Sequence, residues 1–111
     1  MPDNSRIHFN FSGIKKKNSG SFRINVLFNS PNTQILSPDG HGRQYLRIKN
    51  VGTSMVWLGF NQTDATNQGY PLDPNEYIEF AYPDNCPDEL VTATAETGDT
   101  VLSIVMVRWS Q

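Results

Sequence analysis

The sequence is poor in the side chains that catalysis and metal binding most often use. It has one cysteine, Cys86, and two histidines, His8 and His41, in 111 residues. A single cysteine excludes an intrachain disulfide, and without a histidine cluster beside it a zinc site is excluded as well. Neither histidine lies in a catalytic motif, and the carboxylates lack calcium-loop or glycosidase spacing. We therefore predict no catalytic residues, no metal site, no cofactor and no enzymatic activity.

Charged residues and long hydrophobic runs are also scarce. Charged residues make up 18% and hydrophobic residues 37% of the chain, which excludes a coiled coil and a highly charged disordered tail. No apolar run approaches the roughly 18 residues of a membrane-spanning helix. The start, Met1-Pro2-Asp3-Asn4-Ser5, lacks the basic and then apolar order of a secretory signal. We expect a soluble protein made in the cytosol, with no membrane partner.

The net charge of −2 conceals a polarised chain. Residues 1–50 are basic, whereas residues 51–111 carry Arg108 as their only cation among many acidic residues. In one interpretation, basic and acidic strands neutralise one another within a single copy. In the other, they form a bipolar surface that favours head-to-tail contact with another copy or binding to a charged partner. The one basic run, Lys15-Lys16-Lys17, is flanked by Gly13 and Asn18-Ser19-Gly20 and is typical of a solvated loop, so we expect no nucleic-acid partner.

Short runs of alternating apolar and polar residues, separated by glycine, proline, asparagine and aspartate, predict an all-β protein. We expect a single antiparallel β-sandwich or jelly roll of about seven to eight short strands with an N-terminal extended arm. Residues 1–21 would be the arm and a loop, and residues 22–111 the β-sandwich domain. The predicted strands span residues 6–11, 22–28, 33–36, 43–50, 54–60, 76–81, 89–95 and 100–109. Residues 69–75 are predicted to be a loop because two prolines interrupt them.

The alternation also assigns side chains to faces. Ile7, Phe9 and Phe11 share one face of the arm. Arg43, Tyr45, Arg47 and Lys49 share the face of the 43–50 strand that lies opposite its core residues. The final strand is apolar at nearly every position, which predicts that both of its faces are covered.

Several aromatic residues fall outside the predicted core, namely Tyr45, Trp57, Tyr70 and Tyr77. Such residues form a second core layer, fill a subunit interface or stack on sugars. The sequence leaves these three alternatives open.

The stretch from Leu46 to Val107 resembles small β-domains of tailed-bacteriophage virion proteins. The resemblance rests on the order of four motifs: Ile48-Lys49-Asn50-Val51-Gly52-Thr53, then Val56-Trp57-Leu58-Gly59, then Gly69-Tyr70-Pro71-Leu72-Asp73-Pro74-Asn75-Glu76, and finally Ala93-Thr94-Ala95-Glu96-Thr97-Gly98-Asp99-Thr100 before an apolar strand. It implies a structural role in the virion, as a head decoration or cement protein or as a module of a tail or fibre.

The leading hypothesis is a homo-oligomer, favoured to be a trimer, that binds the major capsid protein on the phage head surface and stabilises the shell. In this hypothesis Ile7, Phe9, Phe11, Arg43, Arg47 and Lys49 contact the shell, and Met55, Trp57 and Tyr45 pack between subunits. The alternative is a carbohydrate-binding, host-recognition module on a tail or fibre. Its contacts would be Trp57, Tyr70, Tyr77, Asn61, Gln62 and Asp64.

Overall fold

A computed structural model of the chain describes residues 16–28, 33–40, 42–61, 69–82 and 86–110. These residues form eight strands: β1 (Lys16–Val26), β2 (Thr33–Leu36), β3 (Arg43–Asn50), β4 (Val56–Phe60), β5 (Tyr70–Leu72), β6 (Tyr77–Ala81), β7 (Val91–Ala95) and β8 (Thr100–Ser110). The described part of the chain contains no helix, and so none that is long and apolar enough to cross a membrane. The prediction of an all-β protein is confirmed.

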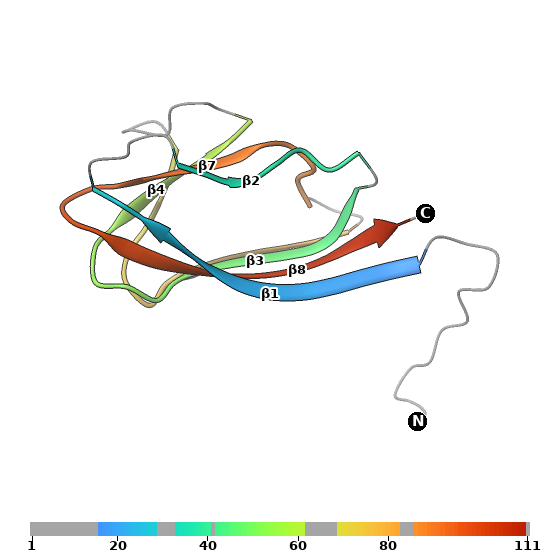
Figure 1. Ribbon diagram of the computed structural model, residues 1–111, viewed down its shortest axis with the longest axis horizontal. Coiled ribbons are helices and arrows are strands. Elements are labelled where there is room, and N and C mark those ends of the chain that lie inside the picture. The colour runs from blue at the N-terminus through green and yellow to red at the C-terminus, as the bar shows by residue number, and fades with distance from the viewer. Residues whose placement is uncertain (1–15, 29–32, 41, 62–68, 83–85, 111) are drawn as a thin grey trace, which may run out of the picture.

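The strands form two antiparallel sheets that pack face to face (Figure 1). The first sheet has the order β1-β8-β3-β6, and the second has the order β2-β7-β4-β5. Every pair of neighbouring strands is antiparallel. This is the layered arrangement expected when each sheet has one apolar face to bury.

The core lies between the two sheets and follows directly from the alternation in the sequence. Leu46 and Ile48 of β3 face Val56 and Leu58 of β4 across the sandwich, and all four are fully buried. On β8, Leu102 and Ile104 complete the same layer in register with β3. The other buried apolar members of the core are Val26, Ile35, Leu36, Leu72, Val91, Ala93 and Ala95.

Strand β1 begins earlier than the sequence indicates. The alternation predicts a strand from residue 22, whereas β1 starts at Lys16 and pairs with β8 at every one of its 11 positions. Lys16 and Lys17 therefore belong to a strand and not to a loop. The long partner strand β8 supplies a ladder of main-chain hydrogen bonds that extends β1 into a segment with no apolar pattern.

Strand β5 forms where the sequence predicts a loop. Pro71 lies opposite Trp57 in the pairing of β5 with β4. Proline is tolerated here because β5 is an edge strand. The N–H that proline lacks would point to the outer side of the sheet, so no hydrogen bond between strands is lost. The predicted strand 6–11, with Ile7, Phe9 and Phe11, lies outside the described residues.

Candidate interaction surface

The outer face of the first sheet brings together four of the residues that the sequence predicts to make contacts: Tyr45, Arg47, Lys49 and Tyr77. Val101, Val105 and Val107 of β8 point to this face, away from the second sheet, and each is half-buried. They lie between the outward side chains of β3 on one side and those of β1 on the other. An apolar stripe on the central strand is therefore bordered by polar and charged strands.

Strand β3 places Tyr45, Arg47 and Lys49 on this face, as predicted. The Arg47 guanidinium lies 5.9 Å from the centre of the Tyr77 ring on the neighbouring strand β6. The Tyr45 hydroxyl donates a hydrogen bond to the Glu79 carboxylate, and this bond raises the pKa of Tyr45 above its ordinary value. Strands β3 and β6 thus share a mixed cationic, anionic and aromatic surface.

Arg43 does not belong to that surface, and the prediction that groups it with Arg47 and Lys49 is wrong. The register of β3 against β8 shifts between Arg43 and Tyr45, which inserts one extra residue and turns Arg43 inward. Its side chain is 2% exposed and donates hydrogen bonds to the carbonyls of Ser37, Pro87 and Glu89. Burial lowers the pKa of the guanidinium. Its three hydrogen bonds make Arg43 an internal link between the segment after β2 and the segment before β7.

The predicted subunit-interface residues lie on different faces of the sandwich. Trp57 belongs to β4 in the second sheet and points away from the core, where its indole N–H donates to Glu96 Oε1 at 2.5 Å. Met55 precedes the same strand and is half-buried. Tyr45, in contrast, lies on the outer face of the first sheet. One flat contact therefore does not include all three.

The residues of the predicted sugar platform are also not brought together. Trp57 and Tyr77 lie on the opposite outer faces of the two sheets. Tyr70 is 47% exposed on the edge strand β5, and Asn61 follows β4 in a left-handed conformation with φ of 58°. Gln62 and Asp64 lie outside the described residues. The geometry gives no common stacking surface for the aromatic rings.

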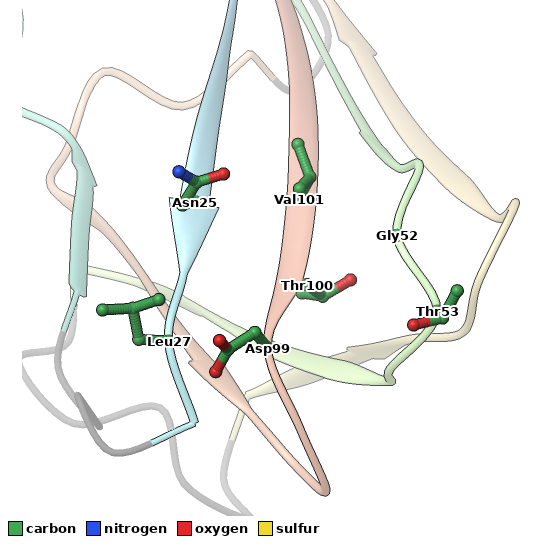
Figure 2. Close-up of a pocket in the computed structure, with 7 residues that line it drawn as sticks. All are labelled: Asn25, Leu27, Gly52, Thr53, Asp99, Thr100 and Val101. Atoms are coloured by element: carbon green, nitrogen blue, oxygen red, sulfur yellow. The ribbon is translucent and has the colours of Figure 1, made fainter.

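A shallow hollow of about 340 Å³ opens at one end of the sandwich (Figure 2). It is lined by Asn25, Leu27, Gly52, Thr53, Asp99, Thr100 and Val101. Two of its polar groups already serve the fold, since Asp99 Oδ1 accepts from the Phe28 N–H at 2.8 Å and the Thr100 hydroxyl donates to Asn50. Within the described ranges no three metal-ligating side chains come together. These two groups of the hollow are thus engaged in hydrogen bonds within the fold.

The two edge strands of the first sheet, β1 and β6, are the other exposed feature. The alternation in the sequence does not predict the first part of β1, before residue 22, as a strand. The residues of β1 from Ser19 to Arg23 are all exposed, and no described strand lies beyond β1. Residues 16–21 carry no apolar alternation, so nothing local marks them as a strand. At the opposite edge, Tyr77 of β6 is 56% exposed.

Comparison with known proteins shows a similarity of fold to a solved structure. No protein-family model and no curated protein matches the chain. A solved structure described as an HTH_3 family transcriptional regulator from Vibrio cholerae matches with a TM-score of 0.58 and 20% sequence identity. The match covers 84% of this chain but 44% of the regulator, so the chain spans less than half of that protein's length. The likeness is one of fold.

The comparison overturns the prediction of a phage virion protein. The similar solved structure is a transcriptional regulator, and no comparison points to a virion, a capsid or a phage tail. This finding contradicts the predicted roles as a capsid decoration protein or a host-recognition module. It also contradicts the predicted location on the phage head. The four short motifs that carry the resemblance are turn and strand patterns, which unrelated β-sandwiches share because they make the same hairpins.

Proposed function

We propose that this chain is a non-enzymatic β-sandwich module that acts by binding further copies of itself, forming a closed homo-oligomer. The observation that carries the proposal is the edge strand β1. It is 11 residues long, exposes Ser19 to Arg23 and presents Phe22 with 41% of its surface exposed. A long edge strand is a template for pairing with another chain, which proteins that stay monomeric usually shorten or cover.

The absence of enzymatic activity is part of the same proposal. The solved structure that this fold resembles is a regulator and not an enzyme. The described thiol also has the wrong character for a nucleophile, because burial raises the pKa of Cys86 to about 11 and keeps it protonated at neutral pH.

The likeness to a regulator is compatible with self-association. The described residues of this chain form strands only, so the fold that it shares with 44% of the regulator is a β-domain. Joining copies is a role that such a β-domain would serve.

Light scattering coupled to size exclusion, at low and high salt, tests the proposal. We expect the full chain to elute at a multiple of its 12.5 kDa mass, with three copies favoured. Charged contacts at the interface would make the assembly weaker at high salt. A mass of one chain at both salt concentrations, up to the solubility limit, would reject self-association.

A further inference from the structure

The hydrogen-bond pattern of the first sheet shows which main-chain groups of β1 face outward. The Val51 N–H, just after β3, donates to the Val101 carbonyl of β8. Because the main-chain N–H and C=O groups of successive residues in a strand point to alternate sides, those of odd-numbered β8 residues point to β3 and those of even-numbered β8 residues point to β1. Ile24 lies opposite Leu102, so even-numbered residues of β1 pair with even-numbered residues of β8 and direct their main-chain groups toward β8. The odd-numbered residues of β1, Arg23 among them, therefore direct their N–H and C=O groups away from β8.

The same reasoning applies to β6 at the other edge. The Asn50 N–H donates to the Glu76 carbonyl, and the Tyr82 N–H donates to the Gln44 carbonyl. Even-numbered residues of this segment thus bond toward β3. The N–H and C=O groups of Tyr77 and Glu79 point to the outer side of β6.

The two edges differ in charge. β1 has the sequence KKNSGSFRINV, with three cations and no acidic residue. β6 has the sequence YIEFA, with Glu79 as its only charged residue and Glu76 directly before it. One edge of the sheet is therefore basic and the other acidic.

We infer that β1 of one copy pairs with β6 of a second copy, so that two four-stranded sheets join into one. This inference rests on the proposed self-association and names the surfaces that carry it. With four antiparallel strands in the sheet, β6 runs opposite to β1. A second copy in the same orientation therefore presents its β1 antiparallel to the β6 of the first. The contact is head-to-tail, which generates rings when the rotation closes.

One register satisfies both faces of the junction. With Arg23 opposite Glu79 of the next copy, a cation meets a carboxylate on the outer face. The same register sets Phe22 opposite Phe80 and Ile24 opposite Ile78 on the inner face. Phe22 is then covered by a partly buried aromatic ring that belongs to the core layer. Aromatic and opposite-charge pairs directly across an antiparallel ladder are both favourable.

Charge disfavours the symmetric alternatives. Pairing β1 with β1 would bring two basic strands together, and pairing β6 with β6 would bring two acidic strands together. Like charges across a ladder are destabilising, so the cations on β1 act against the two-fold contact and favour the head-to-tail one.

Charge reversal in the full-length chain tests the pairing. Arg23→Glu and Glu79→Arg each place like charges across the junction, and each should raise the dissociation constant of the oligomer by about tenfold or more. The variant that carries both changes should associate like the original chain. In an equimolar mixture the two single variants should bind each other, because every contact between unlike copies is complementary, although a closed ring of three retains one contact between like copies.

Lys49→Glu is the matched control, since Lys49 lies on the same face but on the inner strand β3. It should leave the dissociation constant within about twofold of the original value, because surface charges away from a contact contribute little. Thermal unfolding of each variant, followed by circular dichroism, establishes that the single variants remain folded.

The outcomes separate this inference from the proposal on which it rests. If the original chain is an oligomer and neither single reversal changes its mass, the β1–β6 pairing is overturned while self-association stands. Equal weakening by Lys49→Glu, or failure of the two single variants to bind each other in the mixture, overturns it as well. A monomeric original chain rejects both.

Discussion

The Thr100 hydroxyl donates a hydrogen bond of 2.7 Å to Asn50 Oδ1 in the core, joining the end of β3 to the start of β8. Asn50 is fully buried and uses its whole side-chain amide. Its Nδ2 donates to the carbonyls of Ser54 at 2.8 Å and Leu72 at 3.0 Å, and its Oδ1 also accepts from the Gly52 N–H. One polar side chain thus fixes the turn after β3 and ties both sheets together.

Replacing Asn50 by alanine should destabilise the fold strongly. Asn50→Ala leaves two buried carbonyls and two donors without partners, and we expect a loss of about 3 kcal/mol in the free energy of unfolding. Urea denaturation of the variant measures it. Thr53→Ala, at an exposed position three residues away, is the control and should change stability by less than about 0.5 kcal/mol. Similar stability of the two variants would contradict the role of Asn50.

Arg43→Met should also be costly, although methionine fills much of the same space. The substitution removes the donors that hold the carbonyls of Pro87 and Glu89 at 2.9 Å, and that of Ser37. We expect a loss of about 2–4 kcal/mol, because three partly buried hydrogen bonds from a charged donor are lost together.

Arg108→Met is the matched control for this substitution. Arg108 lies opposite Arg43 in the sheet, but its side chain is 45% exposed and its contact with Asp39 is 3.4 Å long. It should cost at most about 1 kcal/mol. Equal losses in the two variants, measured by denaturant unfolding, would show that Arg43 is not the internal link described above.

Gly52→Ala tests the close packing of the turn against β8. A Cβ at this position would lie 2.2 Å from Thr100 Oγ1 and 2.6 Å from the main-chain nitrogen of Val101. The backbone has to shift, and we expect a loss of about 2–3 kcal/mol. Gly98→Ala is the control, since a Cβ there meets nothing within 4 Å. Differential scanning calorimetry should show a lower melting temperature for Gly52→Ala alone.

The Cys86 thiol should react slowly at neutral pH. Burial raises its pKa from 9.0 to about 11, so the reactive thiolate is scarce below that range. The rate of alkylation by iodoacetamide should reach half of its maximum near pH 11, whereas in an unfolded control it should do so near pH 9. Because the folded pKa is the higher one, the contribution of this group to stability is complete below about pH 9 and is lost as the pH rises toward 11. A half-maximum near pH 9 in the folded protein would contradict this assignment.

Some features of this protein are determined by the sequence alone. Alternation with a period of two residues assigns Leu46 and Ile48 to the core and Tyr45, Arg47 and Lys49 to the opposite face, and the structure agrees. Turn-forming residues likewise separate the strands near their observed ends. These features are local, because successive side chains of an uninterrupted strand alternate between its two faces.

The tertiary structure decided the features that depend on pairing between distant segments. The extension of β1 to Lys16 follows from the length of β8, and the inward turn of Arg43 follows from a shift of register against the same strand. Pro71 is accepted in a strand because β5 lies at an edge, and Trp57 and Tyr77 are separated because their strands belong to different sheets. Strand order and register bring together residues far apart in the chain, so no local pattern encodes them. They also decide that the basic and acidic strands of the first sheet lie at its two opposite edges.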